Sequence, residues 1–157
     1  MLIEKLSMKK KYQRYFFIVF LLLLGGTTTF SCKKSSLYTN FPSVTVNKYV
    51  YLNLPPYNTL QVVGNYAYIS DAGYRGLIVY HRSIDEFVAY DRGCTYDPTN
   101  ANSLLEVVSG GLTIKDNHCG STFSLVDGSV SGSPATIPLK TYRVDYDQPN
   151  QKLYIYN

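Results

Sequence analysis

The chain has 157 residues, of which 45% are hydrophobic and 17% are charged, and its formal net charge at pH 7 is +4. Five of the 15 basic residues but only one of the 11 acidic residues precede Cys32, so the chain is neutral from Cys32 onwards. The net charge therefore belongs to the N-terminal segment. Because no basic patch with interleaved aromatic residues follows it, we expect no nucleic-acid partner.

The first 31 residues have the order of a secretory signal peptide. Lys9, Lys10, Lys11 and Arg14 precede an apolar run over residues 16–24, and small polar residues follow. This run is too short to span a bilayer as a helix. Translation could start at Met1 or at Met8, since three lysines follow Met8 directly.

The segment Thr29-Phe30-Ser31-Cys32 resembles a relaxed bacterial lipobox, in which the cysteine becomes the diacylated first residue of a lipoprotein. Phe30 departs from the small residue common at that position. We expect Cys32 to carry a lipid that anchors the protein to a membrane of the bacterial cell envelope, in the periplasm or at the outer membrane. An ordinary cleaved signal that ends near a cysteine is the alternative.

The remaining residues suffice for one domain with a core of its own. We expect a short tether over residues 32–45 and a β domain over residues 46–157. Strand-like runs separated by turn residues fill the domain, at residues 49–54, 60–63, 67–69, 76–80, 87–90, 112–114, 122–126, 142–146 and 153–156. No long 3.6-residue period follows Leu24, so the sequence predicts an all-β fold, a small barrel or sandwich.

Turn chemistry predicts three connections within this domain. Residues 82–85 and 147–150 are expected to close hairpins, and Asp127-Gly128 is a strong signal for a tight turn. His81 is expected to be an exposed cap beside the first hairpin. The many tyrosines fall at period-two positions, which favours strand packing over a ligand-stacking surface.

No motif for nucleophilic, phosphate-binding or metalloprotease chemistry is present, so we do not expect an enzyme.

Two segments resemble the cluster-binding loops of Rieske [2Fe–2S] domains. Gly120-Ser121-x-Phe123, followed by Ser133-Pro-Ala-Thr-Ile-Pro-Leu, is similar to the second loop and the proline loop of that family, and Arg92-Gly-Cys94-Thr-Tyr96 is similar to the first loop. The resemblance implies small antiparallel sheets, with a loop-bearing subdomain inserted between strands of a base barrel or sandwich. It also implies that the proline loop covers the cluster.

The iron ligands of the family, two cysteines on one iron and two histidines on the other, are largely replaced. In this register Cys94 keeps a cysteine position, Asp116 takes the other, and Tyr96 and Cys119 take the histidine positions. Sliding Cys119 onto the cysteine position places Thr122 at the histidine and loses the match to Gly-Ser-x-Phe. We therefore expect no cofactor and a degenerate cluster site.

Because the two loops face each other in the family, the resemblance implies a disulfide between Cys94 and Cys119 in an oxidising compartment. If Cys32 is acylated, these are the only thiols left. The resulting expectation is a cluster-free accessory or binding domain with an unidentified protein partner. The alternative is an electron-transfer protein that holds a [2Fe–2S] cluster, or another metal such as zinc with Cys94, Cys119, Asp116 and His118 as candidate donors.

Overall fold

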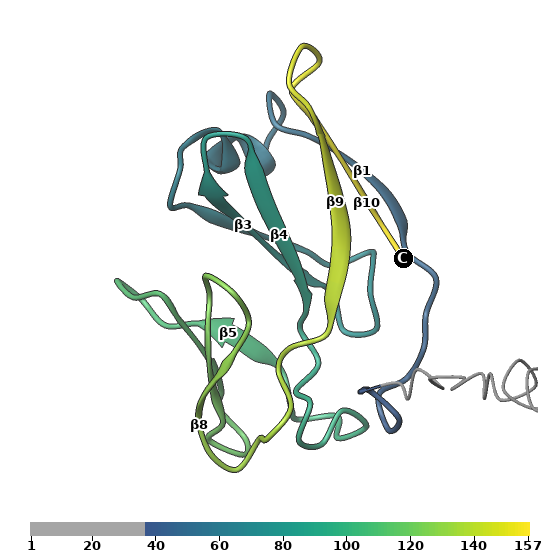
Figure 1. Ribbon diagram of the computed structural model, residues 1–157, viewed down its shortest axis with the longest axis vertical. Coiled ribbons are helices and arrows are strands. Elements are labelled where there is room, and N and C mark those ends of the chain that lie inside the picture. Colours follow the sequence, from purple (N-terminus) through teal and green to yellow (C-terminus); the bar gives the residue numbers. More distant parts are fainter. Residues whose placement is uncertain (1–36) are drawn as a thin grey trace, which may run out of the picture. The chain divides into compact units, whose positions relative to one another are not determined.

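The structure is a computed structural model that describes residues 37–157, which belong to one compact unit (Figure 1). The predicted signal peptide and Cys32 lie outside the described residues. Within residues 37–157 no helix is long and apolar enough to cross a bilayer.

The described chain is all-β, as predicted, and its larger sheet has six antiparallel strands in the order β1-β10-β9-β4-β3-β2. These strands are β1 (Asn47–Tyr51), β2 (Tyr66–Ile69), β3 (Leu77–Ser83), β4 (Glu86–Asp91), β9 (Thr141–Asp147) and β10 (Lys152–Tyr156). Strand β9 pairs with both β4 and β10, so it joins two groups of strands into one sheet. The predicted hairpins connect β3 to β4 and β9 to β10.

The smaller sheet has four strands in the order β5-β6-β7-β8 and is inserted between β4 and β9. Its strands are β5 (Leu105–Val107), β6 (Thr113–Asp116), β7 (Thr122–Ser124) and β8 (Val130–Gly132). The predicted tight turn connects β7 to β8, and Gly128 adopts a positive φ of 72° there. This arrangement confirms the inserted subdomain, and Figure 1 shows it beyond one end of β3 and β4.

Two hydrophobic cores follow from this layering. One face of the larger sheet buries a first core that includes Val50, Leu77, Ala89 and Ile155. The opposite face of β3 and β4 packs on the smaller sheet through residues such as Ile78, Tyr90 and Phe123. Strand β3 is therefore buried on both faces, which explains its nearly continuous apolar sequence.

Two sequence predictions are wrong. Residues 60–63 were expected to form a strand, but Tyr57–Gln61 form the 3₁₀ helix η1, which buries Leu60 in the first core. His81 was expected to be exposed, but it is only 5% exposed. His81 is not at the end of a strand, because β3 extends two residues beyond it. Its ring stacks on that of Phe87, with 4.1 Å between ring centroids.

The end of the predicted tether contacts the domain. Phe41 is buried, and the Tyr38 hydroxyl donates to the Leu139 carbonyl at 2.7 Å. The side chain of Asn157 donates to the Val44 carbonyl and accepts from the Val46 N–H. These contacts fix the chain before β1, while the division between tether and domain stays a prediction.

Candidate functional site

Three potential metal or redox ligands meet where the loop after β4 approaches the turn between β6 and β7. Cys94 lies three residues beyond the end of β4, Asp116 is the last residue of β6, and Cys119 lies in the turn. The two sulfur atoms and a carboxylate oxygen all lie within 4.8 Å of one another. The structure thus brings together three of the four predicted cluster positions.

Cys94 and Cys119 are both thiols in this structure. Their sulfur atoms are 3.7 Å apart, whereas a disulfide bond is about 2.05 Å long. Cys94 is fully buried and Cys119 is half-buried. The predicted disulfide is therefore not formed here and stays a prediction, but the two side chains it would join are neighbours.

Asp116 organises the turn that carries Cys119. Its carboxylate accepts hydrogen bonds from the Ser103 hydroxyl and from the backbone N–H groups of His118 at 2.8 Å and Cys119 at 3.4 Å. Burial alone would raise the pKa of Asp116, but hydrogen bonds from the Ser103 hydroxyl, the His118 N–H and the thiols of Cys94 and Cys119 outweigh it and lower the pKa below its usual range. The site therefore holds a carboxylate at neutral pH.

The environment of Cys94 favours the protonated thiol. Burial raises the pKa of Cys94 to about 12, although the backbone N–H of Tyr96 donates to the sulfur and opposes the shift. An uncharged thiol at this position is consistent with the apolar neighbours that Cys94 has in the second core. Both metal binding and disulfide formation therefore require that the Cys94 thiol first lose its proton.

The predicted proline loop is bonded to both loops of the site. The Ala135 N–H donates to the Ser121 hydroxyl at 3.0 Å, and that oxygen lies 3.1 Å from the Cys119 sulfur. On the other side, the Thr95 hydroxyl donates to the Ile137 carbonyl at 2.6 Å. The loop thus holds the two cysteine-bearing segments at a fixed separation.

A buried carboxylate, Asp91, fixes the start of the first loop. It accepts hydrogen bonds from the N–H groups of Tyr74, Arg75 and Gly93 and from the hydroxyl of Tyr142 at 2.9 Å. Burial first, and then the charge of Asp91, raise the pKa of Tyr142 above its usual range. Gly93 directly precedes Cys94, and Tyr142 belongs to β9. Through its bonds to both residues, Asp91 ties the backbone beside Cys94 to β9.

The other sequence candidates lie outside the group of three donors. The Tyr96 side chain is 57% exposed, and the residue contributes its backbone N–H to the Cys94 sulfur. His118 is exposed, and its Nε2 lies 3.0 Å from the side-chain nitrogen of Asn100.

These donors do not match a [2Fe–2S] cluster held in the manner of the Rieske family. Such a cluster needs four ligands, two on each iron. The resemblance places Cys94 and Cys119 on opposite irons, yet their sulfurs are 3.7 Å apart, and Tyr96 directs only its backbone to the site. The spacing suits two ligands of a single ion or two partners of a disulfide.

Sequence reasoning missed the groups that support these donors. Ser103 carried no signal, because its partner Asp116 lies 13 residues away in the chain. The bond between Asp91 and Tyr142 carried none either, because it joins residues 51 positions apart. Ser121 did carry one, since it belongs to the Gly-Ser-x-Phe match.

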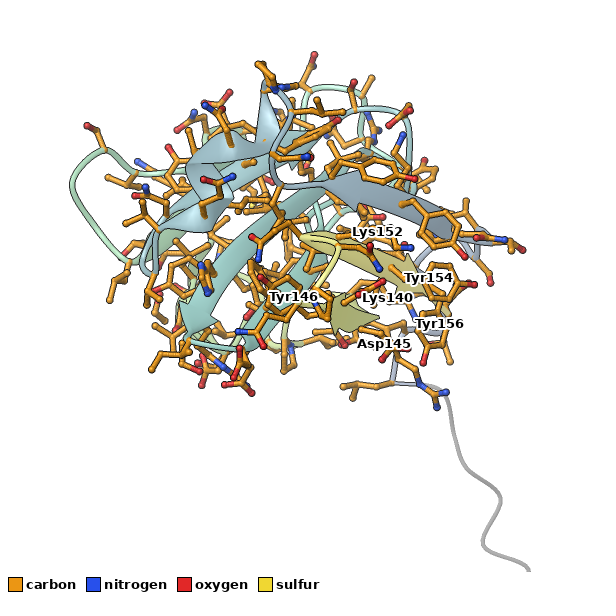
Figure 2. All side chains as sticks on the ribbon, turned by 90° about the horizontal axis from the view of Figure 1, so that it is seen from above. Lys140, Asp145, Tyr146, Lys152, Tyr154 and Tyr156 are labelled. Carbon is orange, nitrogen blue, oxygen red and sulfur yellow. The ribbon has the colours of Figure 1, made fainter. Side chains whose placement is uncertain are left out.

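A separate surface lies on the outer face of β1, β10 and β9. Tyr154 stacks on Tyr49 and on Tyr156, with ring centroids 4.8 and 4.7 Å apart. Figure 2 shows Tyr154, Tyr156 and Lys152 close together on this part of the sheet. The ring faces are used in stacking on one another, which agrees with the predicted role of tyrosine in strand packing.

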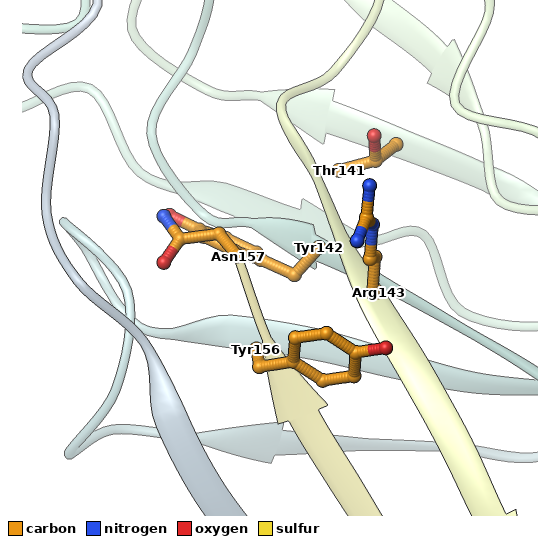
Figure 3. A pocket seen from close by; sticks show the side chains of 5 residues that line it. All are labelled: Thr141, Tyr142, Arg143, Tyr156 and Asn157. Atoms are coloured by element: carbon orange, nitrogen blue, oxygen red, sulfur yellow. The ribbon is translucent and has the colours of Figure 1, made fainter.

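A shallow pocket of about 390 Å³ opens beside this surface (Figure 3). It is lined by Thr141, Tyr142, Arg143, Tyr156 and Asn157, and none of the three donors of the cysteine site contributes to it. The Arg143 guanidinium lies 5.9 Å from the centre of the Tyr156 ring. The Arg143 guanidinium and the Tyr156 ring therefore form a cation–π contact within the pocket lining.

Comparisons with known proteins return structural neighbours only, since no family model and no curated protein matches the chain. A chain from the complex of reduced oxygenase and oxidized ferredoxin in carbazole 1,9a-dioxygenase is 25% identical, with a TM-score of 0.41 over 60% of this chain and 90% of its own. A ferredoxin of Sphingomonas yanoikuyae B1 is 24% identical, with a TM-score of 0.44 over 61% of this chain and 88% of its own.

A third neighbour is described as the small subunit of an NADH-dependent nitrite reductase from Mycobacterium tuberculosis. It is 11% identical, with a TM-score of 0.41 over 73% of this chain and 97% of its own. At these values the likeness does not assign the chain to a family.

Proposed function

We propose that this chain is a lipid-anchored domain of a bacterial cell envelope that holds no iron–sulfur cluster and serves as a non-catalytic binding or accessory subunit. In this proposal Cys94 and Cys119 form a disulfide once the protein is exported. The observation that carries the proposal is the 3.7 Å separation of the two sulfurs on loops that the proline segment bonds together.

Formation of the bond balances as a two-electron oxidation. The two thiols give up two protons and two electrons to a disulfide of an oxidising protein or small molecule, which becomes two thiols. Closing the gap requires the sulfurs to approach by less than 2 Å, which rotation of the half-buried Cys119 side chain toward Cys94 can supply. The bond would then replace the cross-link that a cluster provides between the loops of a Rieske domain.

The disulfide and the cluster are tested on protein isolated from native membranes without reductant. We expect a colourless protein with no bound iron, no thiol that reacts after unfolding, and a peptide pair linked through Cys94 and Cys119. A brown protein with stoichiometric iron would contradict the proposal and support electron transfer instead. The proteins that co-purify with the chain would identify its partner.

The lipid anchor has its own test. Cys32→Ser should either release the protein into the soluble fraction or leave the signal peptide uncut, because the acylated sulfur is then missing. Cys94→Ser is the matched control and should remain in the membrane fraction. Correct processing and membrane retention of Cys32→Ser would contradict the anchor.

A further inference from the structure

The cysteine site in its reduced form has the geometry of a site for one metal ion. Two thiolates bound to a tetrahedral zinc ion at about 2.3 Å each stand about 3.8 Å apart. The Cys94 and Cys119 sulfurs are 3.7 Å apart. This distance is longer than a formed disulfide bond and short for the opposite ends of a cluster, and it matches two ligands of the same ion without further movement.

Asp116 supplies a third donor whose orientation is already fixed. Its two oxygens offer about four lone pairs when ionised. Three hydrogen bonds, from the Ser103 hydroxyl and from the N–H groups of His118 and Cys119, are accepted by this carboxylate. They hold it in place as the partners of metal ligands do. The thiols of Cys94 and Cys119 also donate to this carboxylate, so about one lone pair becomes available to an ion once both thiols lose their protons.

The turn beside the three donors has an accessible part. Cys119 is half-buried, and a methyl group added at Gly120 would have no atom outside its chain neighbours within 4 Å. An ion held by Cys94, Cys119 and Asp116 could therefore keep a water molecule as its fourth ligand. Three protein ligands and a water form an open tetrahedral site.

We propose that the reduced chain binds a single thiophilic divalent ion of the zinc type through Cys94 Sγ, Cys119 Sγ and the carboxylate of Asp116. Binding displaces the two thiol protons into solvent, and the bound ion carries two thiolates and one carboxylate. The Cys94–Cys119 disulfide removes both sulfur ligands, so oxidation and metal binding exclude each other. The inference rests on the proposed cluster-free site, because a cluster would use the same donors.

The test uses the full chain in detergent, reduced with a phosphine, with both Cys94 and Cys119 confirmed as free thiols. Cobalt(II) is titrated as a coloured substitute for zinc. We expect thiolate-to-cobalt charge-transfer absorption and the visible bands of a tetrahedral site, which saturate at one ion per chain. Zinc should then displace the cobalt, and oxidation of the dithiol with diamide should prevent binding.

Variants assign the ligands. Cys119→Ser should abolish the charge-transfer absorption of the thiolate pair. Asp116→Asn should weaken binding by about tenfold or more, because loss of even an outer-shell partner costs a metal site about 10–100-fold. Asp127→Asn is the matched control, since Asp127 is exposed and accepts hydrogen bonds from Ser129 in the next turn, and it should bind cobalt as the unaltered chain does.

Two results would overturn the inference: a fully reduced chain without tetrahedral cobalt bands, or equal affinities for the Asp116→Asn and Asp127→Asn variants. The first result decides the matter even if a variant fails to fold. A colourless protein that is isolated with the disulfide but binds no cobalt after full reduction refutes only this inference, whereas a brown, iron-containing protein refutes the proposed function as well.

Discussion

Asp91 connects the cysteine site to the rest of the domain at the level of a single side chain. It satisfies three backbone N–H groups and the Tyr142 hydroxyl inside the protein. Asp91→Asn replaces one acceptor oxygen by a donor, so at least one of these groups would lose its partner. We expect a loss of about 1–3 kcal/mol in the free energy of unfolding, measured by urea denaturation.

The exposed Asp145 on β9 provides the control for this prediction. Asp145→Asn should change the free energy of unfolding by less than about 0.5 kcal/mol. Similar losses for the two variants would show that the hydrogen bonds of Asp91 contribute little.

The two cysteines should differ in reactivity when the protein is reduced and folded. Burial raises the pKa of Cys94, so little of it is thiolate at pH 8, and the residue is fully buried. Iodoacetamide should therefore modify the half-buried Cys119 before Cys94, as peptide mass spectrometry would show. In urea the two rates should converge, and equal rates in the folded protein would contradict the assigned environment of Cys94.

At the level of elements, η1 closes the first core. Leu60 is fully buried there, whereas Val62, just after the helix, is 59% exposed. Leu60→Ala should lower the free energy of unfolding by about 2–5 kcal/mol because it opens a cavity. Val62→Ala is the control and should be nearly neutral, so comparable losses in urea denaturation would contradict the packing of η1.

The hairpins could be predicted from the sequence because their turn chemistry is local. Asp127-Gly128 and residues 147–150 carry turn residues between apolar runs, and both connect strands. Residues 60–63 could not be assigned in the same way. Their apolar run suits a strand or a short helix equally, and packing of Leu60 into the core decides for the helix.

Strands β5 and β8 could not be predicted from the sequence, because a three-residue strand is too short to show an alternating pattern. Both lie at an edge of the smaller sheet. The grouping of Cys94, Asp116 and Cys119 was implied by the resemblance of their loops to a known family. The residues that fix these donors could not be found that way, because a contact such as that of Tyr142 with Asp91 joins segments 51 residues apart.

For the whole molecule, the disulfide is expected to contribute a large part of the stability. It would close a loop with 24 residues between its cysteines, for which the chain-entropy estimate is about 3.5 kcal/mol. Reduction should lower the free energy of unfolding by up to this amount, and the Cys94→Ser, Cys119→Ser double variant should be insensitive to reductant. Equal denaturation curves with and without reductant for the unaltered chain would mean that the bond is absent or strained.

The most direct measurement is the native mass of the chain isolated anaerobically from its own membranes without reductant. The account predicts the mass of the lipidated polypeptide from Cys32 onwards, less two hydrogens for the Cys94–Cys119 disulfide. An added mass of two irons and two sulfides would contradict it, because it would show that these donors hold a [2Fe–2S] cluster.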